Sequence, residues 1–394
     1  MKPKLILGLS GGVDSAVSAA LLRENYDVSC VFLDIGLGGG EAAAALADSL
    51  SLPFRTVDIR DLLEHFVCAD FQREYLAGRT PLPCARCNPL VKFPALINVA
   101  EAEGAQYVAT GHYARVTPGP DGRVLLRKGM PANDQSYMLS RMTQTILRRV
   151  VFPLGPYEKV QVRAMAAELG LSVAQKPDSM EICFIPDGDY AAWLDRRGET
   201  PPPGDFIDKD GNVLGRHKGY HHYTIGQGRG LGVSGPHRYY VSAIDPVHNT
   251  VTLSDGSDLM ARQVICVRPN WIAADGLDGP MEVTVRLRHS RTETPAVLFP
   301  GAGERVEVQL TEPARAPTPG QLAVFYDGDV VLGSAWIERS GAAWNRDRSR
   351  EIPGAWRGRS SSPWCACRGT SASCWTAATP LRERPSPPPW RGRG

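Results

Sequence analysis

A chain of 394 residues, with 43% hydrophobic and 22% charged residues, has the length and composition of a soluble globular protein of two or three domains. It contains no apolar run that could span a membrane and no apolar leader before its first expected strand, so we expect a cytoplasmic protein. The net charge of +2 does not indicate a nucleic-acid-binding protein, because the segment 341–394 alone has ten arginines and three acidic residues.

The first expected strand ends in a glycine-rich turn. The apolar run at 5–7 stops at Gly8, and SGGVDS follows at 10–15 before a helical pattern begins. In such a strand–turn–helix unit, the glycines leave backbone N–H groups accessible to a phosphate, and the start of the helix adds a partial positive charge. The turn lacks the Gly-Lys-Ser/Thr ending of a Walker loop, so it predicts a different phosphate-binding loop.

Further strands and helices alternate along the first part of the chain. Strands are expected at 28–33, 54–59 and 107–110, and helices at 41–50, 61–76, 93–103, 134–150 and 158–169, with a hairpin at 116–128. This alternation predicts an α/β domain with a doubly wound parallel sheet. Ligands of such sheets bind beyond the carboxyl ends of the strands, where Gly8, Leu33 and Gly111 fall.

The composition changes near residue 198, where proline and glycine become frequent and short alternating segments replace helices. We therefore expect an α/β domain at 1–197, a small β-rich domain at 198–268 and a β-barrel at 269–340. The segment 341–394 is rich in Arg, Pro, Ser and Trp and predicts disorder. It is either a basic RNA-binding arm or a non-native extension, and its scattered tryptophans and cysteines favour the second interpretation.

Nine cysteines in a cytoplasmic chain are expected to be reduced thiols. Cys84 and Cys87 lie in TPLPCARCN at 80–88, and we expect Cys87 just before a helix, where the helix dipole and Arg86 or Lys92 would lower its pKa. Half of a zinc site is the alternative, but no second C-x-x-C pair follows in the folded part. Cys183 lies between Ile182 and Phe184 in KPDSMEICFI at 176–185, which by itself is typical of a buried core residue. The polar residues that precede it in this segment favour a functional role instead.

These motifs together resemble those of the bacterial tRNA-specific 2-thiouridylases, which are PP-loop N-type ATP pyrophosphatases. The resemblance spans about residues 4–338 and rests on SGGVDS, TPLPCARCN with the following Lys92-Phe93, ATGHYAR at 109–115, DQSY at 134–137, FPLG at 152–155, KPDSMEICFI, YTIGQ at 223–227 and PGQ at 319–321. It implies a PP-loop domain, a small central domain and a C-terminal β-barrel that contacts tRNA.

The resemblance also implies a reaction. ATP adenylates the C2 oxygen of the wobble uridine of tRNA, and sulfur carried as a persulfide on Cys183 replaces it to give 2-thiouridine, AMP and pyrophosphate. Cys87 acts as the nucleophile, with a transient Cys87–Cys183 disulfide. The implied partners are tRNA and a persulfide sulfur-donor protein, the implied cofactors are ATP and Mg²⁺, and we expect a monomer.

The resemblance assigns binding roles as well. Contacts to ATP are implied for Gly8, Leu9, Ser10, Gly11, Gly12, Val13, Asp14, Ser15, Leu33 and Gly111. Contacts to tRNA are implied for Leu82, Pro83, Cys84, Asn133, Asp134, Gln135, Arg286 and Leu287. The chain departs from the family at Leu82, where Asn is frequent, and at Leu287, where Tyr is frequent.

Three alternatives remain open. Cys84, Cys87 and Cys183 could instead ligate a [4Fe–4S] cluster that carries the sulfur. The phosphate loop would also suit an amidating or adenylating synthetase that needs neither cysteine, and a non-catalytic RNA-binding protein would not cleave ATP. The histidines at 217, 221 and 222 suggest a metal site, but we favour a surface or RNA-facing role for them.

Overall fold

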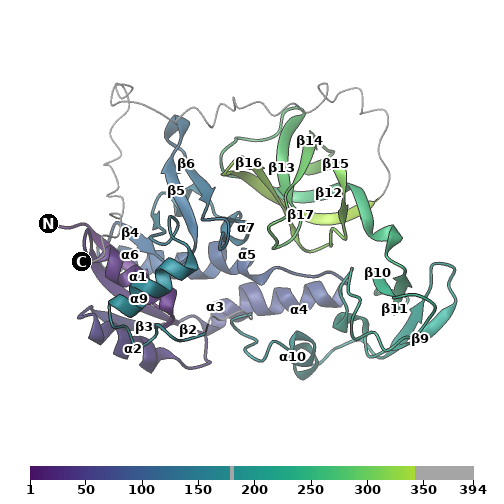
Figure 1. The fold of residues 1–394 in the computed structure, drawn as a ribbon, viewed down its shortest axis with the longest axis horizontal. Helices are drawn as coiled ribbons and strands as arrows, with labels where there is room; N and C mark the ends of the chain where they lie inside the picture. The colour runs from purple at the N-terminus through teal and green to yellow at the C-terminus, as the bar shows by residue number, and fades with distance from the viewer. Residues whose placement is uncertain (178–181, 342–394) are drawn as a thin grey trace.

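The computed structural model describes residues 1–177 and 182–341. A five-stranded parallel sheet, in the order β3-β2-β1-β4-β7, forms the N-terminal domain and confirms the expected doubly wound α/β fold (Figure 1). Its strands are β1 (Lys4–Gly8), β2 (Asp27–Asp34), β3 (Phe54–Asp58), β4 (Tyr107–Ala109) and β7 (Val150–Val151). Every helix in the described ranges is too short or too polar to cross a membrane.

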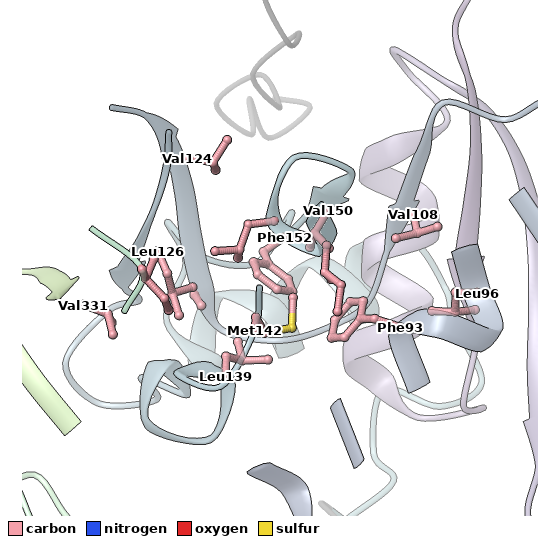
Figure 2. Packing of buried hydrophobic residues seen from close by; sticks show 14 of the residues in the cluster. Phe93, Leu96, Val108, Val124, Leu126, Leu139, Met142, Val150, Phe152 and Val331 are labelled. Carbon is pink, nitrogen blue, oxygen red and sulfur yellow. The ribbon is translucent and has the colours of Figure 1, made fainter. Parts of the chain in front are cut away.

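The two faces of this sheet are covered by different helices because side chains alternate along each strand. Leu5 and Leu7 of β1 pack with α1 (Val13–Leu22), α2 (Gly40–Ser49) and α9 (Lys159–Glu168), whereas Ile6 packs with α6 (Phe93–Ala102). The hydrophobic cluster that contains Ile6 and α6 continues through the hairpin β5 (Ala114–Pro118)–β6 (Val124–Lys128) to residues of the barrel. Figure 2 shows part of this cluster, from Phe93 to Val331. The α/β domain and the barrel therefore share one hydrophobic core.

Three expected helical segments differ in the structure. The helix expected at 61–76 is divided into α3 (Arg60–Leu63), a π-helical turn η1 (Glu64–Cys68) and α4 (Ala69–Leu76). The helix expected at 134–150 is replaced by α7 (Ser136–Leu139) and α8 (Gln144–Leu147), because Thr143 caps the start of α8 and accepts a hydrogen bond from Ile146 N. Cys87 is not just before a helix: it is the last residue of α5 (Pro83–Cys87), which continues through η2 (Asn88–Lys92) into α6.

The rest of the described chain forms two β units. A four-stranded sheet contains β8 (Gly204–Ile207), β9 (Val213–His217), β10 (Tyr240–Asp245) and β11 (Thr250–Ser254), and it follows α10 (Tyr190–Arg197). Six strands close into an antiparallel barrel through the β12–β17 pairing, which confirms the expected barrel: β12 (Met260–Trp271), β13 (Met281–Arg286), β14 (Thr294–Pro300), β15 (Arg305–Arg315), β16 (Leu322–Asp327) and β17 (Val330–Gly341). The expected division after residue 268 falls inside β12, whose pairing with β17 continues on both sides of it.

Candidate functional site

Hydrogen bonds within the glycine-rich turn between β1 and α1 fix its backbone conformation. Ser10 N donates to Ser15 Oγ at 3.2 Å, and Ser15 Oγ donates to Gly12 O at 3.0 Å. Gly11 has a φ of +73°, and a Cβ there would meet the start of α2 at Ala43. The positive φ therefore favours glycine at this position, and the N–H groups of the first turn of α1, which have no side-chain cap among the described residues, can bind an anion.

Two lysines that the sequence analysis did not assign to this loop contact it. Lys159 Nζ donates to both carboxylate oxygens of Asp14 at 2.7 Å, and Tyr113 OH donates to Oδ1 at 2.6 Å. Lys176 Nζ donates to Gly11 O at 3.0 Å. Neither lysine could be placed from local spacing, because each lies more than 140 residues from its partner. The loop thus has two nearby cations that suit the phosphates of a nucleotide.

The structure brings Gly111 and the end of β2 to the same edge of the sheet. A Cβ on Gly111 would lie 3.0 Å from the backbone carbon of Asp14, so the strand end and the loop touch. Beside the loop, a hollow of about 730 Å³ is lined by Phe32, Asp34, Thr56, Arg60 and the start of α2. Leu33 lies at the end of β2 and packs into the cores on either side rather than lining the hollow.

Cys87 and Cys183 lie close together although they are far apart in sequence. Cys87 and Phe184 belong to one hydrophobic cluster, and the charges of the Cys183 and Cys84 thiolates act on Cys87. Cys87 is buried, Cys84 is partly buried and Cys183 is exposed; all three are free thiols. Asp178, Ser179 and Glu181 of the polar lead-in lie outside the described residues, while Lys176 at its start contacts the phosphate loop.

Burial, rather than the helix dipole, controls the cysteine pKa values. Burial raises the pKa of Cys87 to about 11 although the nearby Lys92 lowers it, which contradicts the lowered pKa expected from sequence. The surrounding protein partly desolvates the Cys183 thiol and raises its pKa as well, although the side chain still reaches solvent, and Lys92 again opposes the shift. Arg86 is not among the groups that shift the pKa of Cys87, because its guanidinium pairs with Asp70 at 2.8 Å and donates to Phe66 O. Lys92 is therefore the cation that favours both thiolates.

The segment before Cys84 is fixed by both other domains. Thr80 N donates to Pro319 O at 2.9 Å, and Gln321 Nε2 donates to the carbonyl oxygens of Thr80 and Pro81 at 3.0 and 3.2 Å. Thr80 Oγ1 also lies 3.4 Å from Thr224 Oγ1 of the central domain. The motifs at 223–227 and 319–321, which carried the resemblance without an assigned role, thus position the cysteine loop.

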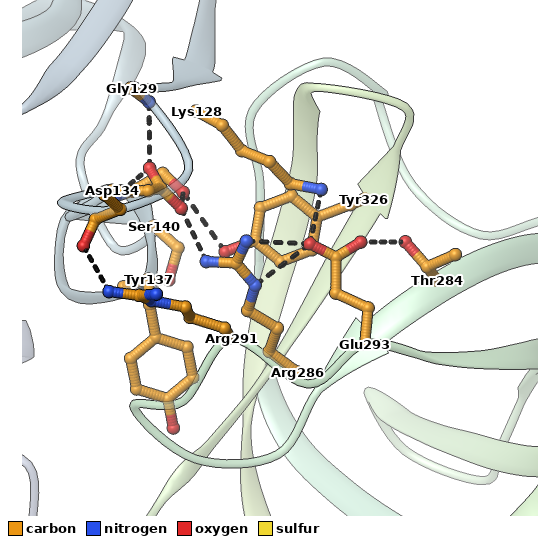
Figure 3. Close-up of polar contacts among 12 residues, drawn as sticks. Lys128, Gly129, Asp134, Tyr137, Ser140, Thr284, Arg286, Arg291, Glu293 and Tyr326 are labelled. Carbon is orange, nitrogen blue, oxygen red and sulfur yellow. Dashed lines mark hydrogen bonds and ion pairs between the residues drawn. The ribbon is translucent and has the colours of Figure 1, made fainter. Parts of the chain in front are cut away.

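Asp134 and Arg286, both expected to contact tRNA, are paired with each other in the structure. The Arg286 guanidinium pairs with Asp134 and donates to Glu293 Oε1 from Nε at 3.0 Å and Nη2 at 2.7 Å (Figure 3). The side chains of Asp134 and Arg286 are 3% and 9% exposed. Asp134 Oδ1 also accepts from Gly129 N at 2.9 Å. This network joins the 133–135 turn to the barrel.

The other expected tRNA contacts are distributed around these two regions. Gln135 exchanges hydrogen bonds with Tyr113, which also donates to Asp14, so the turn adjoins the phosphate loop. Leu287 is buried in the barrel core, Pro83 is buried, and Leu82 and Asn133 are partly exposed. The structure therefore places the 82–84 segment beside the thiols and the 133–135 turn beside the phosphate loop.

A parallel sheet whose first strand leads through a glycine-rich, non-Walker loop into a helix defines the PP-loop class of nucleotide-binding α/β proteins. Family models match three consecutive parts of the chain: residues 3–187 match a tRNA methyl transferase HUP domain, 192–255 a tRNA methyl transferase PRC-barrel domain and 261–337 an aminomethyltransferase β-barrel domain. The tRNA-specific 2-thiouridylase MnmA of Heliobacterium modesticaldum is 45% identical over 360 residues, covering 86% of this chain and 94% of that protein.

The enzyme of the same name from Acetivibrio thermocellus is 41% identical and covers 86% of this chain and 99% of its own length. The chain belongs to the family of tRNA-specific 2-thiouridylases. Among solved structures, the NMN synthetase of Francisella tularensis covers 45% of this chain and 67% of its own length at 20% identity, with a TM-score of 0.31.

Proposed function

We propose that this chain is an ATP-dependent tRNA 2-thiouridylase, a sulfurtransferase that replaces the C2 oxygen of a wobble uridine by sulfur. The observation that carries the proposal is that Cys87 and Phe184, the neighbour of Cys183, share one hydrophobic cluster, while Lys176, seven residues before Cys183, contacts the phosphate loop. A reaction that first activates an oxygen with ATP and then displaces it with sulfur needs these two sites next to each other.

In the first step the phosphate loop binds ATP, and the uridine C2 oxygen attacks the α-phosphate with loss of pyrophosphate. The N–H groups of residues 11–15 and the ammonium groups of Lys159 and Lys176 stabilise the negative charge that develops on the departing pyrophosphate. Mg²⁺ is held chiefly by phosphates and waters in sites of this kind. Asp14, already bonded to Lys159 and Tyr113, is the carboxylate of the loop that would face it.

In the second step the terminal sulfur of a Cys183 persulfide attacks C2, and AMP leaves with the former C2 oxygen. The Cys87 thiolate then attacks Cys183 Sγ, which breaks the sulfur–sulfur bond to the product and forms a Cys87–Cys183 disulfide. The two thiols supply the two electrons that reduce the transferred sulfur, and a reductant must restore them before the next turnover. In the alternative order, Cys87 first releases the sulfur as hydrosulfide, which then attacks C2.

The exposure of Cys183 and the burial of Cys87 suit these different roles. An exposed thiol is accessible to a persulfide donor protein, which we propose as the sulfur source in the cytoplasm. A buried thiol is protected from oxidants until substrate binding assembles the site. The pKa of Cys87 is about 11 in the free protein, so its thiol is largely protonated near pH 7. The positive charge of Lys92 lowers this pKa and therefore favours formation of the thiolate.

A [4Fe–4S] cluster is the alternative sulfur carrier, because the three thiols are near enough to one another for their charges to interact. Cys84, Cys87 and Cys183 would hold it, leaving one iron to supply bound sulfide as the nucleophile. Cluster coordination requires all three residues, whereas the persulfide route requires only two.

The test is mass analysis of the wobble uridine after incubation of tRNA with ATP, a persulfide donor and the protein. We expect 2-thiouridine with the wild type, none with Cys87→Ala or Cys183→Ala, and wild-type yield with Cys68→Ala, a neighbouring buried thiol with no assigned role. Unchanged thiolation in the first two variants would refute the mechanism and favour an ordinary adenylating synthetase. Iron bound after anaerobic purification, together with loss of activity in Cys84→Ala, would favour the cluster.

A further inference from the structure

A cluster of one carboxylate and two imidazoles joins α10 to the central domain, away from the thiols and the phosphate loop. His221 Nε2 lies 2.8 Å from Asp195 Oδ1, and His222 Nε2 lies 3.2 Å from Asp195 Oδ2. The two imidazole rings are adjacent, with centroids 4.3 Å apart. One donor atom from each of the three side chains lies within 4.8 Å of the others.

The distances from the two imidazoles to Asp195 are close to those between two ligands of one metal ion. Ligand atoms about 2.1 Å from a tetrahedral zinc ion lie roughly 3.4 Å from one another. The observed separations of 2.8 and 3.2 Å are shorter by a few tenths of an ångström, as hydrogen bonds are. Because the Asp195 side chain is 45% exposed, it can shift outward by this amount without disturbing the core.

The His221 ring is buried, with a side chain that is 1% exposed, and it is held by a hydrogen bond between Nε2 and Asp195 Oδ1. Its other nitrogen, Nδ1, has no hydrogen-bond partner among the described residues. Gly219 permits this packing, because a Cβ at that position would lie 2.5 Å from the His221 ring.

We propose that Asp195, His221 and His222 form a site for a divalent transition metal ion, for which Zn²⁺ is the best match to two imidazoles and one carboxylate. Water completes the tetrahedron on the exposed side of Asp195. The ion would fasten α10 to the turn η4 (Tyr220–His222), next to the existing hydrogen bond of 3.1 Å from Tyr190 OH to His222 O.

The role that follows is structural. Trp193 of α10 packs against Phe184, with ring centroids 5.3 Å apart, so α10 supports the residue that follows Cys183. A metal ion bound to Asp195 of α10 and to the two histidines would fix α10 against the central domain. Through the contact between Trp193 and Phe184, it would also stabilise the position of the Cys183 segment. The site does not depend on the function proposed above, because none of its ligands takes part in the sulfur chemistry.

Zn²⁺ binding to the full chain tests the proposal. Dialysis against Zn²⁺ followed by elemental analysis should find one equivalent fewer in Asp195→Asn and in His222→Gln than in the wild type, with Zn²⁺ affinity at this site at least about tenfold weaker. His248→Gln is the matched control, because His248 pairs with Asp245 at 2.7 Å on the surface without a third ligand. This control should bind as much Zn²⁺ as the wild type.

Two further measurements separate this site from the thiols and from a folding defect. The spectrum of the Co²⁺-loaded Cys183→Ala variant should show a bound ion without a sulfur-to-metal charge-transfer band. Zn²⁺ should raise the Tm of the wild type and of Cys183→Ala, but not of Asp195→Asn. The proposal is overturned if Asp195→Asn and His222→Gln, folded by circular dichroism, retain the wild-type Zn²⁺ content, or if only the cysteine variants lose the metal.

Discussion

The ion-pair network around Arg286 predicts a large and specific loss of stability on Arg286→Met. The substitution keeps most of the side chain's volume but leaves the carboxylates of Asp134 and Glu293 facing each other without their shared cation. Removing one partner of a buried ion pair costs about 3–5 kcal/mol. Glu293 is 24% exposed and retains Lys128, so we expect a loss near the lower end, about 3 kcal/mol.

The assay is urea unfolding followed by circular dichroism, with midpoints compared at a common m value. Arg305→Met is the matched control in the same barrel, because the Arg305–Glu338 pair is 45% and 38% exposed and should contribute less than about 1 kcal/mol. The reasoning is refuted if the two variants lose similar, small amounts of stability. Adding Asp134→Asn to Arg286→Met should recover part of the loss, because the uncompensated buried charge is then removed.

Three other predictions follow from the site and the network. Lys92→Gln should slow alkylation of Cys87 by iodoacetamide at pH 8, because it removes the cation that opposes the raised pKa; an unchanged rate would contradict this. Gly111→Ala should weaken ATP binding at least about tenfold, measured by calorimetry, because its Cβ would press on the phosphate loop; Gly276→Ala, in open space, should bind normally. Burial raises the pKa of Glu293, but hydrogen bonds and charge interactions with Lys128 and Arg286 outweigh it, so the net pKa is lowered. The ionised Glu293 therefore stabilises the folded protein fully above the unfolded-state pKa of about 4.3, and this contribution is lost as the pH falls through the lowered folded-state value. Glu293→Gln should therefore flatten the acid limb of the stability curve, and an identical limb would refute the assignment.

The sequence was sufficient for features that depend on local pattern. Apolar runs predicted β1 to β4 of the parallel sheet but not the short β7, whose first residue fell at the end of an expected helix. The strand–turn–helix context of residues 10–15 predicted the phosphate loop. The break of the expected helix at 134–150 has a local signal that the apolar pattern concealed, because Thr143 is a good N-cap residue and starts α8. The pairing of Asp134 with Arg286, 152 residues away, has no such local signal. Two of the residues for which the resemblance implies tRNA contacts, Asp134 and Arg286, therefore also hold the 133–135 turn against the barrel.

The error in the pKa of Cys87 has a similar origin. Sequence neighbours such as Arg86 and Lys92 are visible in the motif, but the burial that dominates the pKa arises from Phe71, Phe184 and other residues distant in the chain. Arg86 was misassigned because its true partner, Asp70, lies on another helix. Charge proximity along a sequence therefore predicts a pKa only where the group stays exposed.

The segment that carries Cys183 connects all parts of the site. It begins at Lys176, whose ammonium group now bonds to the carbonyl oxygen of Gly11, and a bound phosphate would compete for that ammonium group. It continues past Cys183 to Phe184, which packs with the Cys87 cluster and with α10. The Cys183 segment thus contacts the phosphate loop through Lys176 and α10 through Phe184. Under the proposed mechanism, a phosphate bound at the loop would release Lys176 from Gly11 and change one contact of the segment that carries the attacking sulfur, which is a physical reason for sulfur transfer to follow activation by ATP.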